Sequence, residues 1–203
     1  TYHYDVGVVV ALEGEELEGI RKLPFDWTEC PVAHDPSRYF IGTVVTATRS
    51  LRIVAVASPR MGLTPAAITA AKLISLFRPR MLVMTGICAG VRGKSALGDI
   101  LVADPCFDWG GGKWIFDKLS GKQSFLPAPY QWRLNESVRS AVRAAGDDAE
   151  LMADVHASFK GRKPASPPKV IIDAMASGAA VLQSQQAMDE VRAQHKNLVG
   201  IEM

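Results

Sequence analysis

The stretch VGVVVAL, residues 6–12, decides the fold class. It is a short and nearly continuous apolar run, and such runs are typical of strands buried on both faces of a sheet. The chain then changes to EGEEL at residues 13–17. These acidic residues indicate the first turn of a helix, because the positive end of the helix dipole favours carboxylates. A buried strand followed by a helix predicts a parallel or mixed sheet covered by helices.

Strand and helix patterns alternate outward from this run. They predict strands at residues 39–47, 51–57, 81–84, 99–104, 170–172 and 198–201, and helices at residues 64–77, 135–145 and 184–195. Thr64 can cap the free backbone N–H groups of the first of these helices, and Pro65 fits its first turn. Because that helix is apolar nearly all round, we expect it to be buried between other elements. The glycine-rich residues 109–113 predict a loop. One α/β domain over the whole chain fits this alternation.

The composition argues against several classes of protein. The 203 residues carry 23 basic and 21 acidic side chains, a balance that does not indicate nucleic-acid binding by bulk charge. No apolar run approaches the roughly 18 residues of a membrane span, and the first residues lack the layout of a signal peptide. The three cysteines form no CxxC pair and the four histidines show no metal spacing. We therefore expect no disulfide framework, no metal and a cytoplasmic location.

A glycine-punctuated stretch, MTGICAG at residues 84–90, follows one of the predicted strands. Glycines at such a place allow a tight turn and the close approach of a ligand to the backbone. The stretch is not a P-loop, because no Gly-Lys-Ser/Thr follows, and it lacks the GxGxxG spacing of a dinucleotide fingerprint. Taken alone, it favours a structural turn slightly over a binding loop.

Several segments, taken in their order and spacing, point to a family. They are VGVVVALEGE at residues 6–15, RMG at 60–62, TGICAG at 85–90, LGDILVAD at 97–104, ASG at 176–178 and VGIEM at 199–203. With them the chain resembles the nucleoside phosphorylase and nucleosidase superfamily, and within it the methylthioadenosine/S-adenosylhomocysteine nucleosidases. The resemblance implies a three-layer α/β/α fold around a mixed, partly barrel-like central sheet. It also implies a homo-oligomer that binds a small-molecule nucleoside or nucleotide and needs no cofactor.

The resemblance implies cleavage of the bond between a ribose and a purine. Such a reaction needs a nucleophile on one face of a ribosyl cation and protonation of the base on the other. Glu15 matches the family glutamate that orients the attacking water. On the residues alone, Glu13, Glu15, Glu16 and Glu18 would be solvated acids at a helix start. The resemblance therefore leads us to expect hydrolysis of the N-glycosidic bond of a purine nucleoside or related nucleotide, with Glu15 as the catalytic group.

Two alternatives to hydrolysis stay open, a phosphorylase and a non-catalytic domain. A phosphate-dependent purine nucleoside phosphorylase would hold its anion with arginines, for which Arg60 and Arg92 are the candidates. The same pair could instead hold a 5′-phosphate, or could simply be surface residues. The second alternative is a non-catalytic, nucleoside-sensing regulatory domain. It is motivated by Ile87, Ala179 and Val181, which stand where the family has a serine, an aspartate and the aromatic residue that stacks on the purine.

The resemblance also implies a set of substrate-binding positions. These are Met61, Gly62, Ile87, Cys88, Ala89, Val181, Leu182, Glu202 and Met203. Phe107 and Trp109 are candidates for the aromatic surface that Val181 does not provide. Glu202 and Met203 match the beginning of a Glu-Met-Glu motif, whose second glutamate and a later aspartate complete the family's site. We therefore expect the natural protein to continue with a further strand and helix.

Overall fold

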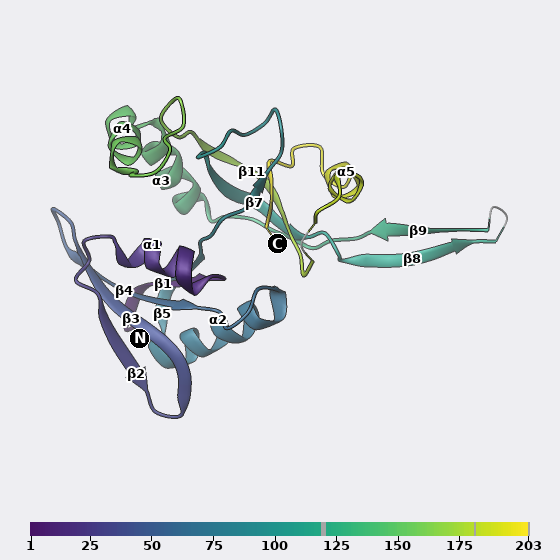
Figure 1. Cartoon of the computed structure of the whole chain (residues 1–203). Coiled ribbons are helices and arrows are strands. Elements are labelled where there is room, and N and C mark those ends of the chain that lie inside the picture. Colours follow the sequence, from purple (N-terminus) through teal and green to yellow (C-terminus); the bar gives the residue numbers. More distant parts are fainter. Residues whose placement is uncertain (119–120, 181, 203) are drawn as a thin grey trace. The chain divides into compact units, whose positions relative to one another are not determined.

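A computed structural model describes residues 1–118, 121–180 and 182–202. The chain packs into two compact units, Thr1–Ile87 and Cys88–Met203. Each unit has a five-stranded sheet of mixed strand direction, and helices lie on both faces of each sheet (Figure 1). The predicted α/β class with three layers is therefore confirmed. Within the described residues, neither sheet closes into a barrel. The single domain and the missing C-terminal strand and helix remain predictions.

The sheet of the first unit has the strand order β2-β3-β4-β1-β5. Its strands are β1 (Tyr4–Val10), β2 (Thr28–Val32), β3 (Asp35–Val45), β4 (Ser50–Ala57) and β5 (Pro79–Met84). β1 runs parallel to both of its neighbours, β4 and β5, whereas β2, β3 and β4 are antiparallel. Val9 and Val10, in successive positions of β1, are both buried. The apolar run of the sequence is therefore a central strand that is covered on both faces, as predicted.

Different helices cover the two faces of this sheet. On one face, Leu73 and Phe77 of α2 (Leu63–Phe77) pack in a cluster with Val9 of β1. On the other face lie a five-residue π-helix, η1 (Glu13–Leu17), and α1 (Glu18–Arg21). Leu17 of η1 packs in a second cluster with Val10. Leu17 is the buried residue that packs the acidic segment after β1 against the sheet.

Two predictions for α2 are wrong. The helix begins at Leu63, one residue before Thr64, and no side chain caps its first turn. It is also buried along one stripe only. Ile68 and Ile74 face outward and are 55% and 50% exposed. The helix is apolar nearly all round, but the first unit encloses only the side that meets the sheet.

The sheet of the second unit has the strand order β10-β7-β11-β12-β6. Its strands are β6 (Ala89–Gly90), β7 (Ile100–Asp108), β10 (Gln131–Trp132), β11 (Val170–Ser177) and β12 (Gly200–Glu202). β7, β11 and β12 run parallel, so their carboxyl ends lie at the same edge of the sheet. The short edge strand β10 pairs antiparallel with β7, and the other edge strand, β6, pairs antiparallel with β12.

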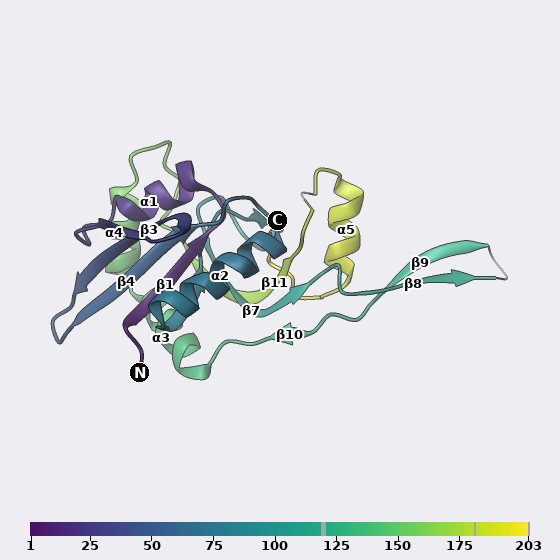
Figure 2. The ribbon, with the colours of Figure 1, turned by 90° about the horizontal axis from the view of Figure 1, so that it is seen from below.

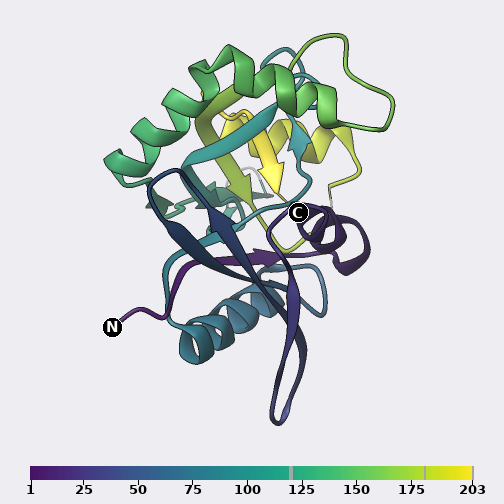
Figure 3. The ribbon, with the colours of Figure 1, turned by 90° about the vertical axis from the view of Figure 1, so that its left-hand side faces the viewer.

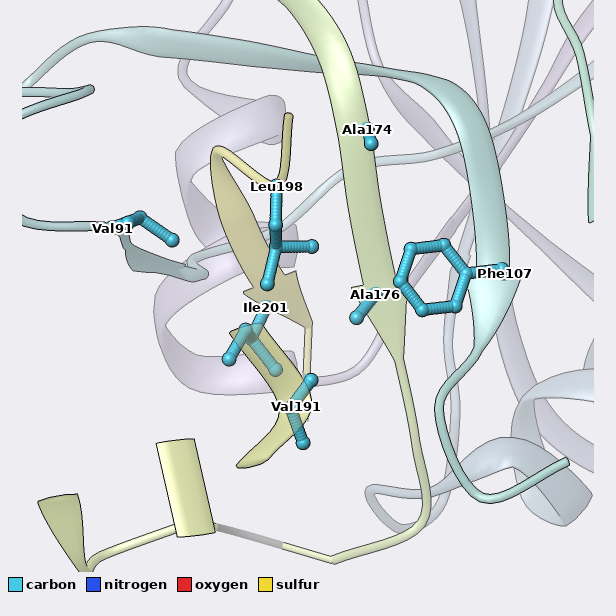
Figure 4. Packing of buried hydrophobic residues seen from close by; sticks show 7 residues of the cluster. All are labelled: Val91, Phe107, Ala174, Ala176, Val191, Leu198 and Ile201. Carbon is cyan, nitrogen blue, oxygen red and sulfur yellow. The ribbon is translucent and has the colours of Figure 1, made fainter. Parts of the chain in front are cut away.

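Helices lie on both faces of this second sheet (Figures 1 and 3). On one side are α3 (Glu136–Asp147) and α4 (Ala149–Ser158), and Arg139 of α3 donates to the buried carboxylate of Asp104 in β7. On the other side lies α5 (Gln185–Ala193). Figure 4 shows the buried cluster of this side, formed by Val91, Phe107, Ala174, Ala176, Val191, Leu198 and Ile201.

A two-stranded ribbon in the second unit is absent from the sequence-based prediction. β8 (Gly112–Asp117) and β9 (Lys122–Pro127) pair antiparallel and form a small sheet of their own. The ribbon extends away from β7 (Figures 1 and 2). Of the predicted loop at residues 109–113, residues 109–111 form a turn, and residues 112 and 113 already belong to β8.

Candidate active site

A carboxylate fixed by backbone groups lies at the carboxyl end of β1. Oε2 of Glu16 accepts hydrogen bonds from the N–H groups of Ala11 and Leu12, both at 2.9 Å. Its Oε1 accepts from the N–H of Ile87 at 2.8 Å. Hydrogen bonds to a charged acceptor are about twice as strong as neutral ones, so these three contacts hold the carboxylate in one position. Glu16 thus joins the loop after β1 to the loop after β5.

The π-helix explains why Glu16, and not its neighbour Glu15, is turned toward these backbone groups. In η1 the N–H of Leu17 donates to the carbonyl oxygen of Leu12, five residues earlier. A π-type turn accommodates one more residue than an α-type turn, and such turns occur frequently at functional sites. The match to the family motif selects Glu15, whereas the wider turn brings Glu16 to the backbone N–H groups. Glu15 itself is exposed.

Gly86 is required by this arrangement. A Cβ atom at this position would lie 2.5 Å from Oε1 of Glu16. Any side chain at residue 86 would therefore push the carboxylate away from the N–H of Ile87. The glycine of the TGICAG stretch permits the close approach of a side chain from another loop, whereas the sequence led us to expect the approach of a ligand.

A pocket of about 290 Å³ opens beside the fixed carboxylate. It is lined by Glu15, Glu16, Gly19, Ile20, Leu23 and residues 85–87. The pocket therefore combines two carboxylates with aliphatic side chains. Two neighbouring negative charges disfavour an anion in the same place. An uncharged nucleophile such as water suits the pocket better than phosphate does.

Three other predicted residues of the first unit lie in one turn before α2. Arg60 and Met61 are exposed, and Met61 is 53% accessible. Gly62 has a φ of 114°, a backbone conformation that favours glycine. The carbonyl oxygen of Arg60 accepts from the hydroxyl of Ser58 at 2.8 Å. With respect to the described residues, the guanidinium group of Arg60 makes no hydrogen bond or ion pair, so it is available to an external anion.

A second group of polar residues lies in the second unit, at the carboxyl ends of its parallel strands. The register places Asp108, Ser177 and Glu202 in one row across β7, β11 and β12. Ligands commonly bind at such an edge of an α/β sheet. Burial raises the pKa of the Cys88 and Cys106 thiols, and the nearby Glu202 carboxylate raises both further. Cys88 and Glu202 were predicted site residues; Cys106 and Asp108 were not.

The aromatic candidates of this edge have different surroundings. Phe107 is buried in the core cluster and stacks on the ring of His195, with ring centroids 5.6 Å apart. It is therefore not available to a ligand. Trp109 lies over Gly178, where a Cβ atom would be 1.9 Å from the indole Nε1. Trp109 is only partly buried. Of the two, Trp109 is the better candidate for an aromatic wall.

The remaining predicted positions also belong to the second unit. Ala89 pairs with Ile201 in the sheet, Arg92 is exposed, and Leu182 borders the core cluster. Ala179 is exposed beyond the end of β11. Val181 and Met203 lie outside the described residues. Among the residues that the structure describes, no three His, Cys, Asp or Glu side chains are grouped as a metal site. No helix in the described parts is long and apolar enough to cross a membrane.

Comparison with known proteins places the chain in a family. The family model for the phosphorylase superfamily matches residues 5–203. The chain belongs to the phosphorylase superfamily. The resemblance read from the sequence segments is thereby confirmed.

The relatives differ in length from this chain. The uncharacterized protein y4jS of Sinorhizobium fredii (strain NBRC 101917 / NGR234) is 34% identical over 200 residues, which make up 98% of this chain and 48% of that protein. The chain thus spans about half the length of the curated relative that it matches.

Solved structures share the fold at low sequence identity. An S-adenosylhomocysteine nucleosidase from Streptococcus pyogenes has a TM-score of 0.67 at 20% identity, covering 100% of this chain and 75% of that one. A 5′-methylthioadenosine/S-adenosylhomocysteine nucleosidase from Colwellia psychrerythraea, in complex with adenine, has a TM-score of 0.70 at 20% identity, with coverages of 100% and 74%. A futalosine hydrolase mutant from Helicobacter pylori has a TM-score of 0.66 at 15% identity, with coverages of 98% and 78%.

Proposed function

We propose that this chain acts as a nucleosidase, which hydrolyses the N-glycosidic bond of a purine nucleoside or related nucleotide. The observation that carries the proposal is the carboxylate of Glu16, held by three backbone N–H groups beside a pocket. In such a reaction positive charge develops on the ribose while water attacks its anomeric carbon. A preorganised carboxylate stabilises that charge and accepts a hydrogen bond from the water.

The acceptor capacity of Glu16 suits it to one water molecule. A carboxylate has about four lone-pair sites, and the backbone occupies three of them in this structure. The site that remains is on Oε1, the atom that also faces Gly86 and Ile87. Glu15 lines the same pocket but makes no fixed contact of this kind among the described residues. We therefore assign the water-orienting role to Glu16 and keep Glu15 as the alternative that sequence matching favours.

Release of free base with and without phosphate tests the proposal. We expect purine release from adenosine, methylthioadenosine or adenosine monophosphate at equal rates in the two conditions. The experiment uses the full protein. Strict dependence on phosphate would replace hydrolysis with phosphorolysis.

Two observations support the competing functions. The guanidinium of Arg60, which makes no hydrogen bond or ion pair with the described residues, is the structural feature that favours a phosphorylase, or a substrate with a 5′-phosphate. The apolar Ile87 and Ala179 favour a nucleoside-sensing domain. Nucleoside binding by calorimetry without any base release would establish the sensor. Tighter binding of the monophosphate than of the nucleoside, lost in Arg60→Ala, would establish the 5′-phosphate contact.

A further inference from the structure

Arg38 of β3 binds two acidic residues that belong to different elements. Its Nε and Nη2 donate to the two carboxylate oxygens of Glu29 in β2, at 3.0 and 2.9 Å. Its Nη1 donates to Oε1 of Glu13, the first residue of η1, at 3.1 Å. The bidentate contact with Glu29 fixes the plane of the guanidinium group, so that the remaining nitrogen is directed at Glu13. Arg38 therefore connects the first residue of the π-helix to the sheet.

The buried ring of Phe40 in β3 holds the other end of the same segment. The guanidinium carbon of Arg21, the last residue of α1, lies 4.2 Å from the ring centroid, a cation–π contact. Leu17 packs in the same buried cluster as Phe40. Residues 13–21, with Glu16 near their middle, are therefore held on β3 at their first residue, at Leu17 and at their last residue.

The start of η1 depends on the contact with Arg38 because little else holds it. Within the described residues, no side chain caps the first turn of η1. A helix of five residues is not stable by itself, since a first turn fixes many dihedral angles for one hydrogen bond. The side chains of Arg38 and Glu13 are 51% and 56% exposed, so ions of the solvent can screen their attraction.

We propose that Arg38 is a positioning residue for Glu16 and makes turnover depend on ionic strength. This inference rests on the proposed function, because it concerns the carboxylate that would orient the water. Arg38 does not line the pocket. It acts through Glu13, by keeping the wide turn that brings both oxygens of Glu16 to the backbone N–H groups. An isolated surface ion pair contributes little to stability, whereas a bidentate arginine shared by two carboxylates is a geometry with a measurable effect.

Steady-state release of free base by the full protein tests this role. Arg38→Met should lower kcat about fivefold, with KM and the unfolding midpoint nearly unchanged, because the carboxylate acts on the water and not on the bound substrate. The matched control is Arg52→Met. Arg52 of β4 is also an exposed arginine over an aromatic ring, but it contacts Tyr4 and the carbonyl oxygen of His3. Unchanged kcat in Arg38→Met, or an equal loss in Arg52→Met, would overturn the proposal.

Glu13→Gln tests the same contact from the side of η1. It should lower kcat as much as Arg38→Met does, and the double variant should be no slower than either single variant, because both changes remove one contact. Raising the salt concentration from about 0.05 M to about 0.5 M should slow the wild type more than Arg38→Met, since screening acts on that contact. Additive losses in the double variant, or equal salt responses of the two proteins, would refute the role of Arg38.

Amide hydrogen exchange measures the hold on η1 without any reference to activity. Exchange within residues 11–17 should be about fivefold faster in Arg38→Met than in the wild type, and unchanged in Arg52→Met. A wild type that releases no base would end the proposed function, whereas faster exchange confined to residues 11–17 in Arg38→Met would still support the hold of Arg38 on η1. Base release by the wild type together with equal exchange in the two variants would refute the role of Arg38 alone.

Discussion

The loop after β5 and the loop after β11 both contain a glycine that another side chain approaches closely, but the approaching groups differ. Gly86 in the first unit meets the carboxylate of Glu16, the end of a flexible side chain. Gly178 in the second unit meets the indole of Trp109, a rigid ring packed beside the core cluster. The first glycine positions a functional group, whereas the second maintains packing. The same substitution should therefore change activity at one loop and stability at the other.

Glu16→Gln should have the largest effect. An amide cannot accept the hydrogen bonds that both oxygens of Glu16 now receive, and it carries no charge. We expect turnover to fall by roughly 10²–10⁴-fold, the range for loss of a positioned acid or base. Steady-state release of free base measures the effect, and thermal unfolding of the variant separates it from loss of fold.

Glu18→Gln is the matched control for this substitution, and Glu15→Gln tests the alternative residue. Glu18 pairs with Arg21 at 2.6 Å on the partly exposed surface of α1, so its loss should leave turnover nearly unchanged. If Glu15→Gln lowers turnover and Glu16→Gln does not, the role belongs to Glu15, as sequence matching predicts. Equal losses in all three variants would leave no reason to choose either residue.

Gly86→Ala should have the next largest effect. The added methyl group would displace Oε1 of Glu16, and a misplacement of about 1 Å can reduce a rate by about 10²-fold. The unfolding midpoint should change little, because a flexible side chain can move aside. Gly14→Ala is the control, since a Cβ there meets nothing within 4 Å and the residue does not line the pocket. A Gly86→Ala protein that keeps wild-type turnover would show that Glu16 need not hold this position.

Gly178→Ala should instead lower stability. The methyl group would force the indole of Trp109 to move, at a cost of about 1–3 kcal/mol typical of overpacking. Urea unfolding measures this cost. In the double variant with Trp109→Phe the smaller ring leaves room for the methyl group, so the two changes should cost less than their sum. Additive costs would mean that the two residues do not share this contact in solution.

The strands β1, β3, β4, β5, β7, β11 and β12 could be predicted from the sequence because their signals are local. The apolar run at residues 6–12 and the glycines of the TGICAG stretch need no knowledge of distant contacts. The choice between Glu15 and Glu16 does need knowledge of distant contacts. It depends on a π-type turn, and on the N–H of Ile87, 71 residues away from the carboxylate. Glu16 directly precedes Leu17, the buried residue of the segment, and this position could have drawn attention to Glu16.

Other features were missed for similar physical reasons. Residues 114–116 are three large apolar residues in succession, a pattern that does not show the alternation of a half-buried strand, so the ribbon was not predicted. Asp108 and Cys106 join the candidate edge only through strand register, which pairs β7 with β11 across more than 60 residues of chain. No local pattern marks either residue.

The smallest predicted effect concerns the thiols of the second unit. Burial is the main cause of the raised pKa of Cys88 and Cys106, and the Glu202 carboxylate is the second. Glu202→Gln removes a negative charge that disfavours the thiolates, so both pKa values should fall. Because the thiolate is the reactive form, alkylation at mildly alkaline pH should become roughly two- to threefold faster. Mass spectrometry of digested protein gives the rate at each cysteine, with Cys30 of β2 as the internal reference. A uniform change at all three cysteines would indicate loosening of the fold, and an unchanged rate at Cys88 and Cys106 would show that Glu202 does not act on them. Faster reaction confined to those two would place the carboxylate beside both thiols, at the edge where β7, β11 and β12 end.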